Sequence, residues 1–207
     1  MGDDGVGIIK IQSPMLNRVI AFSVTKAVPK TVLFETDKHE YQLLRPHHSD
    51  AIINFVTETF VNANPVLVGY AKTRPHMAQE LKRGLDIFGA RYIEDCTTND
   101  LSIVTVDKKS DEVLGVALLK DYSVFKSLTA LEQQNDLLKN YAVLDKVLWN
   151  QVDHPIKACR TQKGKIFYMM AIAIDQKLRG EGSGSTMMKL IDEQARKNHF
   201  KYLYSIC

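Results

Sequence analysis

The segment from Ile166 to Asn198 constrains the fold of this chain more than any other part of the sequence. It opens with an uninterrupted apolar run, Ile166–Ile174, which predicts a buried strand. Glycines then stand at alternate positions, 180, 182 and 184. A helical pattern follows, which places on one face Met187, Met188, Ile191 and Ala195. The segment therefore predicts a strand, a tight glycine loop and an amphipathic helix.

This unit is suited to binding a phosphate group. The first N–H groups of a helix have no intrahelical acceptor, and the helix dipole places about half a positive charge at that end. Glycines allow a ligand to approach the backbone and permit φ values that side chains disfavour. Arg179 adds a permanent charge and a planar set of donors. The alternative is an ordinary glycine-rich turn before a helix.

Two common phosphate motifs fit this loop poorly. A P-loop requires a lysine directly after its last glycine, and no lysine stands there. A dinucleotide-binding loop requires Gly-x-Gly-x-x-Gly with an acidic residue about 20 positions later. Here the glycines alternate without the longer step, and Asp192 and Glu193 come too early, inside the helix. A nucleotide-binding α/β domain therefore remains only as an alternative.

The pattern Arg179-x-x-Gly182-x-Gly184 after an apolar strand resembles the acetyl-CoA pyrophosphate loop of the GNAT family of N-acetyltransferases. The resemblance covers roughly residues 39–207 and implies an α/β (α+β) fold with a mixed, mostly antiparallel sheet flanked by helices. Residues 1–38 are interpreted as a β-leaning N-terminal extension. Related chains continue past the fifth core strand with a helix and two strands, so the domain is expected to be C-terminally incomplete.

The periodicity of the remaining sequence agrees with that order of elements. Lys108–Asp111 is predicted to be the turn of an antiparallel hairpin. The patterns predict strands at 31–36, 40–45, 101–107, 113–120 and 200–206, and helices at 49–62, 75–88 and, in broken form, 124–150. The last of these is a helical insert between the third and fourth core strands. This insert and the ending Lys201–Cys207 resemble the arylalkylamine N-acetyltransferase-like branch of the family.

The resemblance implies that acetyl-CoA is the co-substrate and that no metal is required. The pantetheine arm of acetyl-CoA is expected to pair with the backbone of Ile172, Ala173 and Ile174, where one N–H faces the thioester carbonyl. Its pyrophosphate is expected to contact the loop residues Arg179, Gly180, Glu181, Gly182, Ser183, Gly184 and Ser185. The hydroxyls of Ser183 and Ser185 are expected either to donate to the ligand or to cap the helix.

No residue is assigned as the catalytic base. In the arylalkylamine branch a glutamate precedes a proline after the first helix, whereas here Asn64 precedes Pro65, and an amide cannot accept a proton near pH 7. Glu58 is a candidate base, but it also fits a solvated helix face. His47 and His48 are also candidates, because the intrinsic pKa of imidazole suits a base, but they fit an exposed or capping pair as well. His154 and Tyr168 are interpreted as a loop residue and a core residue.

Composition indicates the compartment and the kinds of partner, but it does not identify a substrate. The cysteines, Cys96, Cys159 and Cys207, are odd in number and far apart, so they predict no disulfide framework or metal site and favour a reducing, cytoplasmic compartment. The net charge of +3 is too small to argue for a nucleic-acid partner. No apolar run reaches the length of a membrane span, and no membrane partner is expected.

The sequence therefore predicts an acetyl-CoA-dependent N-acetyltransferase that moves an acetyl group to a primary amine by direct attack on the thioester. A small amine is the expected acceptor, and the oligomeric state is left open. Two alternatives stay open beside it. The first is a non-catalytic acyl-CoA-binding module, favoured by Asn64 and the early end of the chain. The second is a protein or lysine N-acetyltransferase.

Overall fold

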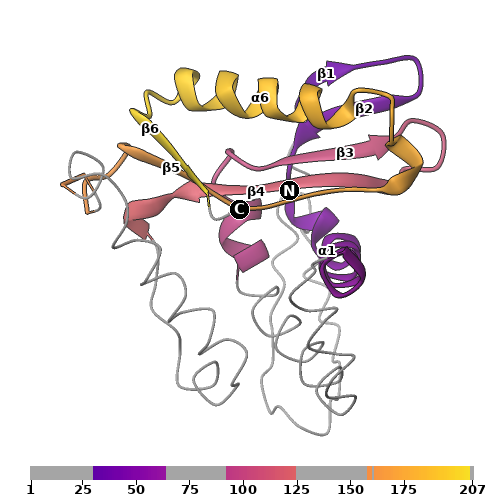
Figure 1. The fold of residues 1–207 in the computed structure, drawn as a ribbon, viewed down its shortest axis with the longest axis horizontal. Helices are drawn as coiled ribbons and strands as arrows, with labels where there is room; N and C mark the ends of the chain where they lie inside the picture. Colours follow the sequence, from indigo (N-terminus) through magenta and orange to yellow (C-terminus); the bar gives the residue numbers. More distant parts are fainter. Residues whose placement is uncertain (1–29, 64–91, 125–157, 160, 206–207) are drawn as a thin grey trace, which may run out of the picture. The chain divides into compact units, whose positions relative to one another are not determined.

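The structure is a computed structural model that describes residues 30–63, 92–124, 158–159 and 161–205 (Figure 1). All of these except Lys30 belong to one unit, Thr31–Cys207. Its strands are β1 (Val32–Glu35), β2 (His39–Leu43), β3 (Ile103–Asp107), β4 (Val113–Asp121), β5 (Ile166–Ile174) and β6 (Tyr202–Ser205). Its helices are α1 (Ser49–Ala63) and α6 (Ser183–Lys197), with short 3-10 turns η1 (Pro46–His48), η2 (Tyr122–Val124) and η4 (Gln176–Leu178).

The strands form one sheet in chain order, β1-β2-β3-β4-β5-β6. Every neighbouring pair from β1 to β5 is antiparallel, whereas β5 and β6 are parallel. A parallel pair needs a crossover connection, and α6 supplies it. The predicted mixed, mostly antiparallel sheet flanked by helices is therefore confirmed.

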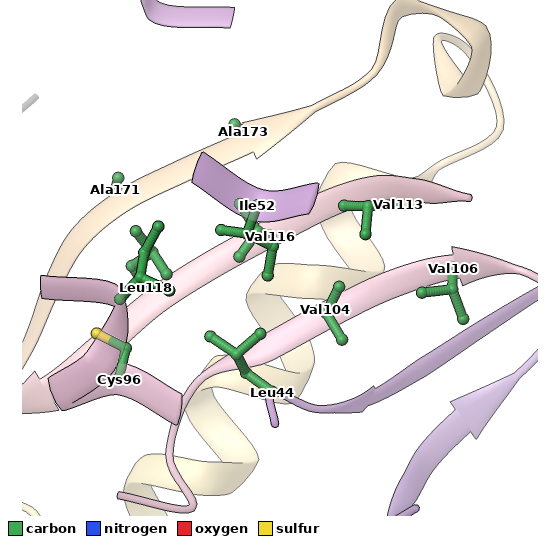
Figure 2. Close-up of a cluster of buried hydrophobic side chains, with 11 residues drawn as sticks. Leu44, Ile52, Cys96, Val104, Val106, Val113, Val116, Leu118, Ala171 and Ala173 are labelled. Atoms are coloured by element: carbon green, nitrogen blue, oxygen red, sulfur yellow. The ribbon is translucent and has the colours of Figure 1, made fainter. Parts of the chain in front are cut away.

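Two apolar clusters pack on opposite faces of the sheet. The first contains Ile52 of α1 and side chains of β3, β4 and β5, including Val104, Val116 and Ala171 (Figure 2). The second contains, from α6, Met187, Leu190 and Ile191, and from the strands Ile103, Ala117, Leu119, Phe167 and Met169. Because adjacent strand residues point to opposite faces, α1 and α6 cover the two sides of one sheet (Figure 1).

Two β-bulges interrupt this alternation. Between β3 and β4, Thr105 pairs with Gly115 and Val106 with Val113, which leaves Leu114 as the extra residue. Between β4 and β5, Leu118 pairs with Ala171 and Leu119 with Met169, which leaves Met170 as the extra residue. A bulge shifts the side-chain order by one residue. Consequently Phe167 and Met169 face α6 before the bulge, and Ile172 and Ile174 face α6 after it.

The β3–β4 turn forms as predicted. The carboxylate of Asp107 accepts the backbone N–H groups of Ser110 and Lys109 at 2.9 and 2.8 Å. These hydrogen bonds, that of Ser110 first, hold the pKa of the Asp107 carboxyl below its usual value. The turn therefore fixes one end of the sheet with local polar contacts.

Most other predicted elements inside the described ranges also form. The strand bounds of β5 agree with the prediction, and the first predicted helix appears as α1. A helical segment at residues 92–97 was not predicted. The N-terminal extension, the helix at 75–88 and nearly all of the insert at 124–150 lie outside the described residues, and the boundary after residue 38 stays a prediction. Within the described residues, no helix has the length and hydropathy needed to cross a membrane.

Candidate functional site

The loop after β5 is anchored to the sheet by its first residue. The backbone N–H of Asp175 donates to the carbonyl of Leu114, the bulged residue of β4, at 2.8 Å. The Asp175 carboxylate in turn accepts the N–H of Lys177 at 2.8 Å and so begins the 3-10 turn η4. The chain therefore leaves the sheet at a fixed position and direction.

Glycine is required at two positions of this loop by backbone conformation. Gly180 and Gly182 have φ values of 84° and 75°, in the left-handed region that side chains disfavour. Gly184 is different, because its φ is not in this region and an added Cβ would lie 3.7 Å from Cδ1 of Ile174, an ordinary contact. Backbone conformation therefore requires glycine at positions 180 and 182 but not at position 184.

The start of α6 leaves several backbone donors available. Gly182 is the N-cap residue, and no side chain caps the helix. Its carbonyl accepts the N–H of Thr186 at 2.9 Å. The N–H groups of Ser183, Gly184 and Ser185 come before that bond, and within the described residues no acceptor is bonded to them. The expectation that a serine caps the helix is therefore wrong, because a glycine occupies the N-cap position.

The charged side chains of the loop differ in their engagement. Lys177 pairs with Glu112 at 2.7 Å, and this hydrogen bond raises the pKa of the lysine. The Glu181 carboxylate lies 3.9 Å from Nζ of Lys38 and 3.8 Å from Nδ1 of His39. Arg179 is exposed, and no carboxylate of the described residues lies within ion-pair distance of it. Arg179 is thus the loop cation that is available to an anionic ligand.

The second half of β5 has one open edge. β6 pairs only with Ile166–Met169, whereas β4 pairs along β5 as far as Ile174. From Met170 onward, β5 has no partner on the β6 side within the part of the chain that the structure describes. This edge runs directly into the loop and the start of α6. Unpaired strand backbone and helix N–H groups therefore lie on one continuous stretch, residues 170–185.

The described candidate base residues lie on η1 and α1. His48 is buried, and its Nδ1 accepts the N–H of Arg45 at 3.1 Å, which agrees with the capping alternative. Its ring centroid is 3.9 Å from that of the exposed His47. Glu58 is exposed on α1. Asn64, Pro65 and His154 lie outside the described residues.

Tyr168 is a core residue, as predicted. It stacks against Tyr204 of β6 at a centroid distance of 5.6 Å and meets the edge of the Tyr122 ring at 5.3 Å. All of these rings are buried in one cluster with Ile166. Such edge and offset contacts are typical of packed aromatic cores.

The described cysteines are not placed as nucleophiles. Cys96 is fully buried in the cluster beneath Ala171 and Ala173, and burial raises the pKa of its thiol to about 11. Cys159 is half-buried against the tyrosine cluster, and Cys207 lies outside the described residues. A search of the described residues found no group of His, Cys, Asp or Glu side chains arranged to hold a metal ion.

Solved structures share this fold. The C-terminal condensation domain of Ebony in complex with beta-alanyl-dopamine has a TM-score of 0.60 at 18% identity, covering 81% of this chain and 75% of that chain. Arylalkylamine N-acetyltransferase 2 from Aedes aegypti has a TM-score of 0.55 at 18% identity, covering 81% and 74%. Mosquito arylalkylamine N-acetyltransferase like 5b has a TM-score of 0.52 at 14% identity, covering 81% of this chain and 75% of that chain. No family model and no curated protein matches the chain.

These similarities concern the fold. The described residues have the fold of GNAT N-acetyltransferases, and the structures that resemble them include arylalkylamine N-acetyltransferases. At these identities the likeness is one of fold, so the reaction has to be argued from the residues of this chain.

Two features of the site were not predicted from sequence. The bulge at Met170 lies inside an unbroken apolar run, where no polar residue or glycine marks the extra position. The contacts of Glu181 with Lys38 and His39 join segments far apart in the sequence. Opposite charge is the one signal that they offer, and it is shared by many other residue pairs in a chain with 27 basic and 24 acidic residues.

Proposed function

We propose that this chain is an acetyl-CoA-dependent N-acetyltransferase that acts on a small primary amine. The observation that carries the proposal is the open edge of β5 leading directly into free helix N–H groups at residues 183–185. A pantetheine arm carries amide groups that can pair with a strand edge, and a diphosphate suits a helix start. One continuous stretch thus offers complementary groups to both ends of the same cofactor.

The proposed roles follow the chemistry of acetyl transfer. The backbone of Ile172, Ala173 and Ile174 holds the pantetheine arm, and one N–H there polarises the thioester carbonyl. The diphosphate lies against Arg179–Ser185, where Arg179 supplies the charge. The neutral amine nitrogen attacks the carbonyl carbon, the carbon–sulfur bond breaks, and the proton of the nitrogen passes through solvent to the departing sulfur, so that CoA leaves as the thiol. This direct transfer needs no enzyme nucleophile, which agrees with the burial of Cys96.

A small amine is favoured as the acceptor by two similarities of fold. The Ebony condensation domain was solved in complex with beta-alanyl-dopamine, and other structures of this fold are arylalkylamine N-acetyltransferases. The residue before Pro65 argues for a second candidate, because Asn64 cannot accept the proton of an ammonium group. That candidate is an acyl-CoA-binding module without catalysis.

The test has two parts. Isothermal titration with CoA measures binding, and a thiol-release assay with acetyl-CoA and a panel of arylalkyl and alkyl amines measures transfer. We expect both binding and transfer. Binding without thiol release on any amine or peptide mixture would establish the non-catalytic module, and Asn64→Glu would then be expected to raise activity. Transfer to peptides alone would favour a protein N-acetyltransferase. A chain stabilised against heat by ATP or NAD but not by CoA contradicts the proposal.

A further inference from the structure

The diphosphate loop contains a carboxylate that its proposed ligand should repel. Glu181 stands between Gly180 and Gly182, directly before the free N–H groups of α6. Two like charges a few ångströms apart repel by about 1 kcal/mol in water and by more where solvent is partly excluded. A loop that binds a diphosphate therefore has to keep this side chain either distant or neutralised.

The other acidic groups around the loop are already engaged. Asp175 uses its carboxylate to accept the N–H of Lys177 at 2.8 Å. Glu112 accepts from the Lys177 ammonium at 2.7 Å. Glu181 is left as the acidic residue whose position decides the electrostatic potential at the start of α6.

The partners of Glu181 come from the turn between β1 and β2. One carboxylate oxygen lies 3.9 Å from the Lys38 ammonium, and the other lies 3.8 Å from Nδ1 of His39. His39 is buried and is the first residue of β2, whereas the Lys38 side chain is 74% exposed. Both oxygens of Glu181 thus face groups that carry, or can carry, a positive charge.

This turn is itself held firmly. The hydroxyl of Thr36 accepts the N–H of His39 at 2.9 Å, and the N–H of Thr36 donates to the carbonyl of His39 at 2.8 Å. The carbonyl of Lys38 accepts the N–H of Lys108 from the β3–β4 turn at 2.8 Å. The backbone at Lys38 and His39 is therefore part of the sheet, and it provides a fixed point for a side chain of the loop.

We propose that Lys38 and His39 are positioning residues for the diphosphate of acyl-CoA. They hold the Glu181 carboxylate at the β1–β2 turn and offset its charge, so that Arg179 and the N–H groups of residues 183–185 face the ligand without a competing anion. This inference rests on the proposed function, because it assigns partners to the same loop. It adds that the first hairpin of the sheet, distant in sequence, sets the affinity for the cofactor.

The experiment is a mutant cycle read by isothermal titration with CoA at low salt. The double variant Lys38→Ala/His39→Gln releases Glu181, and we expect it to bind CoA about three- to fivefold more weakly than the wild type. Glu181→Gln alone is expected to bind at least as tightly as the wild type. The triple variant is expected to bind like Glu181→Gln, because releasing an uncharged side chain has no electrostatic cost.

Controls separate this role from a structural one. Lys109→Ala removes an exposed lysine of the β3–β4 turn, whose ammonium has no carboxylate within ion-pair distance among the described residues, and it should leave CoA affinity unchanged. Lys38→Arg in the His39→Gln background should recover part of the affinity. The difference between the double variant and the wild type should shrink when salt rises from about 0.05 to 0.5 M, which a purely structural defect would not do.

The inference is overturned if the double variant binds CoA like Lys109→Ala, or if the triple variant stays as weak as the double variant. Either result, with normal binding by the wild type, leaves the proposed function intact. A wild-type chain that does not bind CoA overturns the proposed function and this inference together.

Discussion

The two halves of β5 are both apolar, and they differ in their neighbouring strands. Residues 166–169 are buried and pair with β6, and residues 167–169 also pair with β4. Residues 170–174 are equally apolar, but within the described structure they pair with β4 alone, and their burial alternates between half-buried and buried. The first half is scaffold, whereas the second half carries the candidate site.

The difference shows that a missing partner, rather than a polar side chain, marks the site on this strand. The run from Ile166 to Ile174 contains no charged residue, so no charge marks the second half as a site. What differs is whether the backbone N–H and C=O groups on one edge have a neighbouring strand. A ligand that carries amide groups can take the place of that strand, so the second half of β5 can hydrogen-bond to such a ligand through its backbone.

Truncation of Phe167 is the strongest way to test the scaffold half. Phe167 is fully buried and stacks on Phe200 at a centroid distance of 4.7 Å. We expect Phe167→Ala to lower the free energy of unfolding by about 3–5 kcal/mol, measured by urea denaturation. Leu203→Ala, at a position that is 44% exposed on the neighbouring β6, should cost less than about 1 kcal/mol. Equal losses of unfolding free energy in the two variants would contradict the assignment of residues 166–169 to the core.

The thiol of Cys96 tests whether the second half of β5 is buried on its α1 side. It lies in the cluster with Ala171 and Ala173, and burial raises its pKa from 9.0 to about 11. Because the folded state keeps the proton longer than the unfolded state, this contribution to stability is present below about pH 9 and is lost as pH rises towards 11, by about 2–3 kcal/mol.

Urea unfolding at a series of pH values measures this loss. The fall between pH 9 and 11 should be smaller for Cys96→Ala by the contribution of the thiol, since other titrating groups are common to both chains. Native Cys96 should also resist alkylation by iodoacetamide at pH 8. Rapid alkylation without unfolding would show that the open half of β5 is not covered on its α1 side.

Gly182→Val tests whether the loop conformation serves the open half. The φ of 75° at Gly182 is strained for any side chain and most for a β-branched one, so we expect a loss of stability of about 1–3 kcal/mol. CoA affinity should fall more than about tenfold, because the helix N–H groups move out of line. Gly184→Ala is the matched control, since its backbone and surroundings accept a methyl group. Equal behaviour of the two variants would contradict the role of the backbone.

Arg179→Ala should affect the ligand and leave the fold unchanged. Its side chain is exposed and has no carboxylate partner among the described residues, so the stability should change by less than about 0.5 kcal/mol. CoA should bind about tenfold more weakly, as expected for a lost charge-assisted contact with phosphate. Arg179→Lys should recover part of the affinity, and high salt should narrow the gap. If Arg179→Ala bound CoA with the wild-type affinity in isothermal titration, Arg179 would have no role in the site.

The scaffold half was the easier half to predict from sequence. The apolar run of β5 appears in the structure with the predicted bounds, and the periodicity after Gly184 predicted α6. Hydrophobic patterns of this length leave few alternatives, because a buried strand and an amphipathic helix each have a characteristic period. The fold class followed from the order of such elements.

The open half was predicted only in outline. Its backbone role came from a family resemblance, and the assignment of Ile172–Ile174 and Arg179–Ser185 to acyl-CoA stays a prediction. The bulge at Met170 depends on how β4 and β5 align, which no local pattern encodes. Tertiary pairing decides all of these features.

The bulge at Met170 also limits how the chain can change in length. Because the bulge adds one residue to β5, the side chains of Ile172 and Ile174 point to the α6 side, as do those of Phe167 and Met169. Ala171 and Ala173 lie on the α1 side. Removing Met170 would leave these two sets on their present faces, because Leu118 and Leu119 of β4 are consecutive and Met169 and Ala171 would then alternate as in a regular strand. The bulge is therefore the place in β5 where the strand can lose one residue and keep both cores, whereas a deletion elsewhere in the strand would exchange the two sets.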